Sequence, residues 1–350
     1  MKILYLYAEV MGYTMATIKE LSVQGAEVHV VHWDKDKLTP YKMTDYLNVN
    51  PYPRSGHSLA SLRALAQKVE PDITVVSGWQ DKTYLGVALW LRKQGKVVVC
   101  GFDDQWHGTL KQYLAAVLGL SRYFTRYFSH AWVAGVYQYE YARKLGFRKQ
   151  EIIFDLYSAD LTLFHRAYQK SLARKTSAYP HRFLFVGRFE PIKGLDTLLG
   201  AWQQLTDHCG DWELHLIGNG SLKDQLAATP GVVVKDFMQP DKLVNEISET
   251  GCFILPSRGE PWGVVVHEFA AAGLPLIVSD VVGATTSFLV PGMNGFHFNA
   301  NDISGLASAM KQIIRTADIE LANMGHASNL LSTRITPETS AKYLLSLCQN

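Results

Sequence analysis

The chain has 350 residues, of which 47% are hydrophobic and 19% charged, so it is long enough for two domains with full cores and is not a disordered chain. No apolar run approaches the ~20 residues that span a bilayer, and the first residues lack a signal-peptide cleavage site, so we expect a cytoplasmic protein. The net charge of +2 hides an asymmetry: residues 1–165 carry +4, residues 166–182 carry +5 and residues 183–350 carry −7. The basic first half indicates an anionic partner, such as a membrane surface or a phosphorylated acceptor.

In the first half of the chain, apolar strands alternate with amphipathic segments. A helix is predicted over residues 14–24. The predicted strands cover residues 2–7, 27–32, 72–78, 96–100 and 130–135, with a short one near 151–154. This alternation is typical of a parallel sheet with helical crossovers, and it predicts a first domain over residues 1–165. The polar, basic segment 166–182 is interpreted as a linker.

The second half repeats this pattern, with a helix predicted over residues 195–205. Its predicted strands cover residues 183–189, 212–220, 232–237, 252–257, 274–280 and 295–298. We therefore predict an α/β fold with two Rossmann-like, doubly wound domains that face a cleft, the second over residues 183–335. A C-terminal helix is predicted over residues 336–350. It could pack on either domain, including back on the first.

The segment PSRGEPWGVVVHE, residues 256–268, is the most informative part of the chain. It leads from a buried strand into a small-residue helix, and such loops in α/β proteins bind anions through unpaired amides and the helix dipole. Gly263 lets a phosphate or a sugar approach the backbone. Glu260 and Glu268 could accept hydrogen bonds from sugar and ribose hydroxyls. The alternative, that both are solvated charges beside a core helix, is less favoured because Glu260 lies among Pro, Gly and Trp residues.

Two cations follow the first strand of the second domain. Arg188 and Lys193 in VGRFEPIKG could hold a diphosphate and offset the charge of a departing nucleoside diphosphate. A pair of exposed basic residues is the alternative. Loops after parallel strands converge at one sheet edge, so the proximity of Glu260 and Glu268 favours the catalytic interpretation. Gly218 and Asn219 begin another loop there, where a nucleoside could lie close to the backbone, although a plain turn is also compatible.

Together these motifs resemble the retaining glycosyltransferases of family 4, which have the GT-B fold. The resemblance covers most of residues 183–312 and includes VGRFEPIKG, IGNG and the two glutamates with seven residues between them. It implies that Glu260 contacts the donor sugar, Glu268 the ribose, and Arg188 and Lys193 the diphosphate. It also implies that the amides of Trp262, Gly263 and Val264 face the sugar and phosphate, that no metal is needed, and that no cofactor is used beyond the nucleoside-diphosphate sugar that serves as donor. Attack on the front face, with the leaving phosphate helping to remove the acceptor proton, would retain the anomeric configuration.

The first half departs from the family pattern in two places. The loop after the first strand offers only Gly12 near the donor phosphates. After the strand at 96–100, where the family often has a histidine, the sequence reads GFDDQWHG. Asp103, Asp104 or His107 could orient the acceptor hydroxyl or act as base, and each could equally be a cap or turn residue.

The segment 109–128 combines leucines and aromatic residues with three basic residues and no acid. Such a helix can lie on an anionic bilayer, which would make the protein peripheral on the inner face of the membrane. A core helix with a solvated basic edge is slightly favoured, because crossover helices bury such faces.

The sequence thus predicts a retaining, metal-independent hexosyltransferase that moves a sugar from a nucleotide donor to a glycan or lipid-linked acceptor, in polysaccharide or glycolipid synthesis. A sugar-nucleotide 2-epimerase of the same fold and a non-catalytic sugar-binding protein are the alternatives. A nicotinamide dehydrogenase is disfavoured because no G-x-G-x-x-G follows the first strand, and no nucleic-acid-reading motif is present. The sequence does not identify the sugar, the base, the acceptor, the linkage or the oligomeric state.

Overall fold

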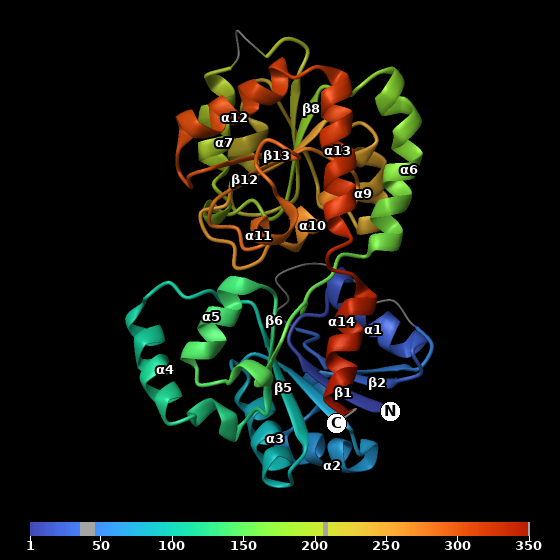
Figure 1. Ribbon diagram of the computed structural model, residues 1–350, viewed down its shortest axis with the longest axis vertical. Coiled ribbons are helices and arrows are strands. Elements are labelled where there is room, and N and C mark those ends of the chain that lie inside the picture. Colours follow the sequence, from blue (N-terminus) through green and yellow to red (C-terminus); the bar gives the residue numbers. More distant parts are fainter. Residues whose placement is uncertain (36–45, 206–208, 349–350) are drawn as a thin grey trace. The chain divides into compact units, whose positions relative to one another are not determined.

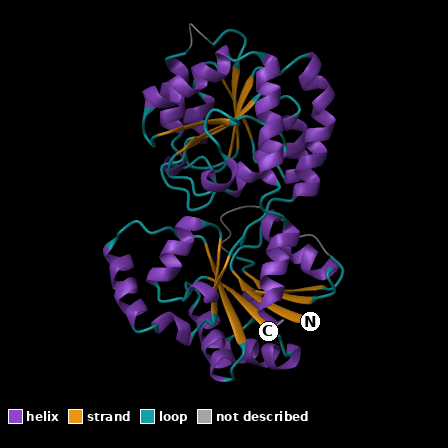
Figure 2. Ribbon diagram, in the orientation of Figure 1, coloured by secondary structure: helices purple, strands orange, loops and turns teal. Residues whose placement is uncertain are grey.

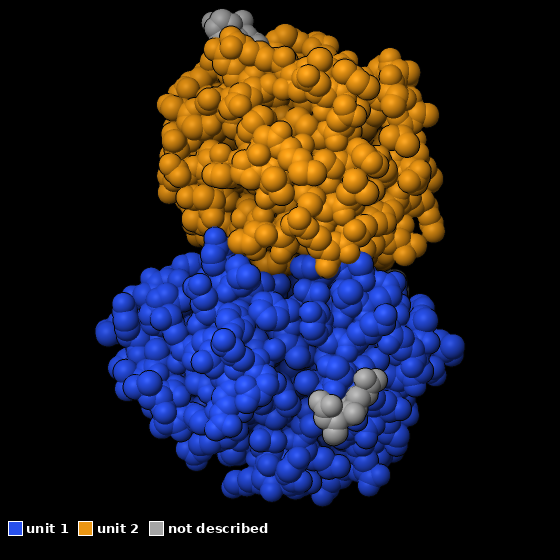
Figure 3. All heavy atoms as spheres, in the orientation of Figure 1, with its two compact units in different colours: residues 1–158, 335–350 blue, residues 159–334 orange. Residues whose placement is uncertain are grey.

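The computed structural model describes residues 1–35, 46–205 and 209–348. The chain forms two compact units, coloured separately in Figure 3. Unit 1 comprises residues 1–158 and 335–350, and unit 2 comprises residues 159–334. The chain therefore leaves unit 1 after residue 158 and returns to it at residue 335.

Unit 1 contains a seven-stranded parallel sheet in the order β3-β2-β1-β4-β5-β6-β7, with helices on both faces (Figures 1 and 2). The strands are β1 (Lys2–Tyr7), β2 (Glu27–His32), β3 (Val49–Pro53), β4 (Ile73–Ser77), β5 (Val97–Phe102), β6 (His130–Val133) and β7 (Ile152–Ile153). The helices are α1 (Gly12–Val23), α2 (Leu59–Val69), α3 (Lys82–Lys93), α4 (Leu110–Leu120), α5 (Val136–Lys144) and α14 (Pro337–Leu345). The central strands are Val-, Ile- and Leu-rich because both faces of the sheet are covered.

Strand β3 was not predicted. Its sequence, VNPYP, contains Pro51 and Pro53, which cannot donate to a sheet and argue against a strand. Among the described strands, β3 lies at the edge of the sheet and pairs with β2 alone, so prolines are tolerated there.

Unit 2 contains a six-stranded parallel sheet in the order β10-β9-β8-β11-β12-β13. Its strands are β8 (Arg182–Val186), β9 (Glu213–Ile217), β10 (Val232–Lys235), β11 (Cys252–Leu255), β12 (Leu276–Ser279) and β13 (Gly295–Phe298). The helices are α6 (Leu161–Ser177), α7 (Leu195–Gln203), α8 (Lys223–Ala227), α9 (Pro240–Ile247), α10 (Val264–Ala271), α11 (Thr285–Phe288), α12 (Ile303–Arg315) and α13 (Asp318–Ser332). Every predicted strand of this half is present, and the doubly wound topology is confirmed.

The segment predicted as a linker, residues 166–182, instead forms most of α6 and the start of β8. Arg166, Lys170 and Arg174 are exposed, whereas Lys175 is buried. Leu161, Phe164, Ala167, Tyr168 and Ser171 recur at helical spacing and are buried as well. The helix packs against α9, α10 and α13. The spacing of the buried residues is that of an amphipathic helix. The linker was predicted from the polar, basic composition of the segment, which does not reveal this spacing.

The C-terminal helix α14 packs beside α1 and belongs to unit 1 (Figure 1). Of the two placements left open by the sequence, the return to the first domain is the one observed. Thr336 begins the helix with a capping box, and the hydroxyl of Ser340 donates to the carbonyl of Asp155 at 2.6 Å. Residues 349 and 350, at the end of the predicted helix, lie outside the described residues.

The favoured interpretation of residues 109–128 as a core helix is wrong. The segment forms α4 and a separate 3-10 turn (Tyr123–Arg126), joined at Arg122, which adopts a left-handed conformation with φ of +54°. Gly119 is the only residue of α4 that is buried, and most of its large apolar side chains are exposed. In the part of the chain that the structure describes, no helix is long and apolar enough to cross a membrane.

Candidate functional site

In unit 2, the loop after β11 is shaped by Gly263. Its φ is +88°, and a Cβ at this position would lie 2.9 Å from Cγ1 of Val282 and 3.0 Å from Cγ of Glu260. Both the conformation and the space therefore require glycine. Gly263 occupies the N-cap position of α10, which begins at Val264. Glycine has no side chain, so no side chain caps the first turn, and the amides of Val264 and Val265 can receive an anion.

Trp262 anchors this loop from behind. Its ring is only 1% exposed and lies edge-on to Phe288 of α11, with 6.3 Å between the ring centroids. The Trp262 carbonyl accepts a hydrogen bond from the amide of Ala284 at 2.8 Å. Among the described residues, the buried indole N–H has no acceptor. The large side chain thus serves packing, and only the backbone of Trp262 is a candidate for ligand contact.

Lys193 and Glu260 meet as an ion pair between Nζ and Oε2. Lys193 ends a 3-10 turn (Pro191–Lys193) after β8, whereas Glu260 lies in the loop after β11. Their side chains are 14% and 15% exposed, so the pair is partly shielded from water but remains accessible. The sequence prediction that these two residues share one sheet edge agrees with this contact.

Backbone contacts hold these two loops together. Gly194 has φ of +67°, and a Cβ there would lie 2.1 Å from the carbonyl oxygen of Pro256. The amide of Arg258 donates to the carbonyl of Ile192 at 2.8 Å, and its Nη1 donates to the carbonyl of Pro191 at 3.0 Å. Arg258 also forms an ion pair with Asp196. The turn that presents Lys193 is therefore fixed by the same loop that carries Glu260.

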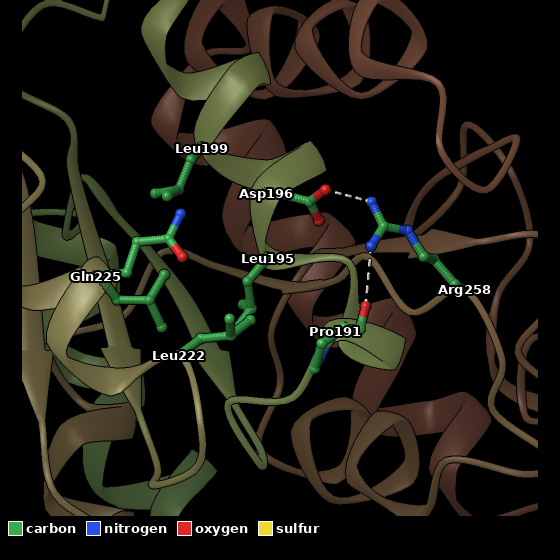
Figure 4. A pocket seen from close by; sticks show the side chains of 8 residues that line it. Pro191, Leu195, Asp196, Leu199, Leu222, Gln225 and Arg258 are labelled. Atoms are coloured by element: carbon green, nitrogen blue, oxygen red, sulfur yellow. Dashed lines mark hydrogen bonds and ion pairs between the residues drawn. The ribbon is translucent and has the colours of Figure 1, made fainter.

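The same two loops border a pocket of about 240 Å³, which Pro191 and Arg258 help to line (Figure 4). Most of its lining residues are apolar, among them Leu195, Leu199 and Leu222, and Asp196 in the lining forms the ion pair with Arg258. None of the residues predicted for the donor site lines it. The pocket is connected to the site through Arg258, which lines the pocket and also donates hydrogen bonds to the turn that carries Lys193. The sequence analysis gave Arg258 no role, although it stands in the predicted loop.

Arg188 lies beside the Gly218 loop. A Cβ on Gly218 would lie 1.8 Å from the carbonyl oxygen of Gly187, and the amide of Phe189 donates to the carbonyl of Asn219 at 2.8 Å. The residues on both sides of Arg188 are therefore packed backbone to backbone against this loop. The guanidinium itself is exposed and forms no hydrogen bond or ion pair with any described residue. It is available to an anionic ligand.

Glu268 lies in the second turn of α10 and is half-buried. Its carboxylate accepts no hydrogen bond from the described residues. Burial raises the pKa of Glu268 to about 7, and the nearby negative charge of Asp160 adds to the shift. A half-buried carboxylate without a partner is costly in an empty protein, and ligand hydroxyls could supply the missing hydrogen bonds.

His267, next to Glu268, fixes the orientation of α10. Its Nδ1 accepts from the amide of Ala159 at 3.1 Å, and its Nε2 lies 2.8 Å from the carbonyl oxygen of Ser332, which assigns the proton to Nε2. Burial lowers the pKa of His267 to about 3, so the ring is neutral at physiological pH. His267 was not predicted from the sequence. A histidine inside a small-residue helix was its only signal.

In unit 1, Asp103, Asp104 and His107 share the loop between β5 and α4, and Gly12 is the first residue of α1, directly after the β1 loop. The carbonyl of Asp103 accepts from Nε2 of Gln138 at 2.9 Å. Desolvation raises the pKa of Asp104, and the charge of His107 opposes the shift. His107 is exposed, and its amide donates to Oε1 of Gln112 at 2.8 Å. These contacts fix the loop backbone and leave the side chain of His107 at the surface.

Unit 1 also has a hollow of about 330 Å³ that the sequence analysis missed. It lies where β2, β3 and β4 end and is lined by Trp33, Arg54 and Asp81, among others. Nε of Arg54 donates to Oδ2 of Asp81 at 2.9 Å, and Oδ1 of Asp81 caps α3 by accepting from the amide of Thr83 at 2.8 Å. An aromatic ring beside paired polar groups is suited to sugar binding. Asp81 directly precedes α3, so its role as the N-cap of that helix could have been predicted from the sequence.

Within residues 1–35, 46–205 and 209–348, no three His, Cys, Asp or Glu side chains are grouped so that they could hold a metal ion.

Residues 180–316 match the family model of "Glycosyl transferases group 1", and this segment contains Arg188, Lys193, Glu260 and Glu268. This part of the chain is similar to the group 1 glycosyltransferases. The chain is 29% identical to a glycogen synthase of Mycobacterium tuberculosis over 149 residues. The aligned part covers 41% of this chain and 36% of that relative. The match thus spans little more than a third of that relative's length.

The fold of the whole chain is GT-B. The chain superposes on sucrose-phosphate synthase from Thermosynechococcus elongatus with a TM-score of 0.76 and 17% identity, covering 100% of this chain and 98% of that one. It also superposes on HepE of Anabaena in complex with UDP, with a TM-score of 0.72, 16% identity and full coverage of both chains. At these identities the likeness is one of fold, and the predicted GT-B architecture is confirmed.

Proposed function

We propose that the protein is a retaining glycosyltransferase of family 4 that transfers a sugar from a nucleoside-diphosphate sugar to a glycan or lipid-linked acceptor. The observation that carries the proposal is the Lys193–Glu260 ion pair, which unites a phosphate-binding cation and a sugar-binding carboxylate at one edge of the unit 2 sheet. The similar HepE structure contains UDP, which supports a uridine nucleotide as the first donor to test.

The donor would be held by cationic groups at its diphosphate and by carboxylates at its hydroxyls. Arg188 offers an exposed, planar fork for two phosphate oxygens, and the Lys193 ammonium has three protons, so it can retain Glu260 while it contacts the diphosphate. The uncapped amides of Val264 and Val265 add partial positive charge. Glu260 would accept from the sugar hydroxyls and Glu268 from the ribose.

These groups favour departure of the nucleoside diphosphate. As the bond from the anomeric carbon to the phosphate oxygen breaks, negative charge grows on the diphosphate, where Arg188, Lys193 and the amides already stand. The acceptor oxygen would attack the same face, and its proton would pass to the leaving phosphate. Retention of configuration follows from this front-face path. No metal enters this scheme.

The acceptor side is proposed for unit 1. Asp103, Asp104 and His107 are the candidates to orient the acceptor hydroxyl, and the hollow at Trp33 and Asp81 offers a ring and a carboxylate to a sugar. The hollow at Trp33 and Asp81 is thus a second candidate acceptor surface of unit 1, in addition to the loop predicted from the sequence.

The test is a panel of UDP- and GDP-sugars incubated with acceptor extracts and then analysed by mass spectrometry and NMR. We expect one donor to be consumed, in the presence of EDTA as well, and a product with the donor's anomeric configuration. An inverted product would contradict the retaining mechanism. Formation of a 2-epimer without acceptor would identify an epimerase, and binding without turnover would identify a sugar-binding protein.

A further inference from the structure

Helix α4 presents its large apolar side chains to solvent. Leu114 is 59% exposed, Val117 63% and Leu120 87%. We call the exposed apolar residues of this helix the α4 surface; its members are Leu110, Tyr113, Leu114, Val117, Leu118 and Leu120. Six large apolar side chains on three turns form a patch of a kind that folded proteins keep for a partner or a membrane.

The helix is held in this orientation by specific contacts. A Cβ on Gly119 would lie 2.2 Å from the carbonyl oxygen of Lys144, so α4 touches the end of α5 through a residue without a side chain. At the other end, Nε2 of Gln112 donates to the carbonyl of Gln105 at 2.6 Å, and Thr109 caps the helix. The inward residues Gln112, Ala115, Ala116 and Gly119 are mostly small, so the apolar face is built to point outward.

Exposed basic residues lie on and next to the helix that carries the α4 surface. Lys111 is exposed on the helix itself, and Arg126 is exposed in the 3-10 turn that follows. The Nζ of Lys144 lies 4.7 Å from the ring centroid of Trp106, whose ring in turn lies 5.0 Å from that of Tyr113. From residue 105 to residue 150 the chain has seven Lys or Arg and a single acid, Glu140. An apolar face beside basic residues is complementary to one leaflet of an anionic bilayer. The apolar side chains would contact the acyl chains, and the basic side chains would contact the lipid phosphates.

We propose that α4 is an interfacial membrane anchor that binds anionic lipid. With 11 residues the helix is too short to cross a bilayer, so it would lie in the plane of the interface with the α4 surface in the acyl region. Lys111, Arg126 and Lys144 would face the lipid phosphates. Figure 1 shows α4 on the outside of unit 1, beyond α5. This inference does not rest on the proposed transfer reaction.

The experiment is flotation of the full chain with vesicles of phosphatidylglycerol and phosphatidylcholine, compared with vesicles of phosphatidylcholine alone, at low salt. We expect binding only to the anionic vesicles, and at least a tenfold loss in the double variant L114Q/V117Q. The matched control is V23Q, which removes another apolar side chain of unit 1, 68% exposed, and should bind like the wild type. For charge, K111Q/R126Q should weaken binding several-fold, whereas K93Q, at an exposed site on α3, should not.

All these changes replace exposed side chains, so the thermal midpoint of each variant should match that of the wild type. Absence of binding to anionic vesicles, equal binding to neutral ones, or undiminished binding by L114Q/V117Q would each overturn the proposal. A wild-type dimer that L114Q/V117Q converts to a monomer, without vesicle binding by either, would also overturn it and would assign the α4 surface to a second copy of the chain.

Discussion

The carboxyl edges of the two sheets are built differently. In unit 2, the loops after β8, β9 and β11 are tied to one another by short contacts, among them Lys193 with Glu260 and the amide of Arg258 with the carbonyl of Ile192. In unit 1, the loop from Asp103 to His107 is tied by its backbone to Gln138 and Gln112, and the side chain of His107 is exposed. The unit 2 edge is thus organised before a ligand arrives, as tight binding of one constant ligand requires.

The difference between the two edges agrees with the proposed function. A nucleotide sugar presents the same diphosphate and ribose to every member of a family, so the residues that bind it can be fixed in place. An acceptor varies, and side chains on a less constrained loop can change with little effect on the fold. We therefore expect substitutions at the unit 2 edge to be more damaging than those at the unit 1 edge.

The largest effect is expected at Lys193. K193A removes the cation that would neutralise the leaving diphosphate and also leaves Glu260 without this partner, so turnover should fall about 100-fold to 1,000-fold. Release of nucleoside diphosphate by the purified protein measures this. The control is R174A, which breaks another ion pair of unit 2, Arg174 with Glu249, whose side chains are 52% and 35% exposed. Equal turnover in both variants would remove Lys193 from the site.

The next test concerns the contact between the loops. G194A places a Cβ against the carbonyl of Pro256 at φ of +67°, whereas G95A in unit 1, at φ of +76°, meets nothing within 4 Å. Both substitutions strain the backbone by about 1 kcal/mol. Only G194A adds a steric clash, so its loss of stability should reach roughly 2–4 kcal/mol and donor binding should weaken. Urea unfolding compares the two variants, and equal losses would mean that the loop contact is unimportant.

Glu268 should make donor binding depend on pH. Its pKa is raised to about 7 in the folded protein, so the carboxylate is largely protonated below that pH and ionised above it. A carboxylate accepts hydroxyl hydrogen bonds better than a carboxylic acid, so affinity for the donor should rise as the pH passes 7. At pH 8, E268Q should bind about tenfold more weakly than the wild type and show a flat profile.

Calorimetry with a UDP-sugar measures this, because its diphosphate stays ionised across the range. The same raised pKa predicts the opposite trend for folding: this group's contribution to stability is greatest below pH 4.5 and is lost as the pH rises towards 7. An affinity that does not change between pH 6 and 8 would contradict the role of Glu268.

The smallest effects are expected in unit 1. D103N, D104N and H107A should leave donor hydrolysis unchanged, and at least one should slow transfer to the acceptor on the order of fivefold through poorer orientation. If all three variants transfer at the wild-type rate, the acceptor hydroxyl is oriented elsewhere, and W33A at the hollow of unit 1 becomes the next variant to measure.

The sequence by itself determined where most strands lie along the chain, and it placed Lys193 and Glu260 at one edge of the same sheet. Buried parallel strands need continuous apolar runs, and strands recognised in this way bring the loops that carry Lys193 and Glu260, 67 residues apart, to one sheet edge. Two elements were not predicted correctly from the sequence. The two prolines of β3 argued against an edge strand, and the charges of residues 166–182 argued against the helix α6, which has a buried face.

Only the tertiary structure decided which side of a helix is covered. The apolar residues of α4 are compatible with a core position in the sequence, and the close approach of Gly119 to α5 is what turns them outward. The same holds for Arg258, His267 and the hollow at Trp33, whose partners come from segments far apart in the chain. Periodicity reports that a face is apolar, but packing against neighbouring elements determines whether that face is buried or exposed.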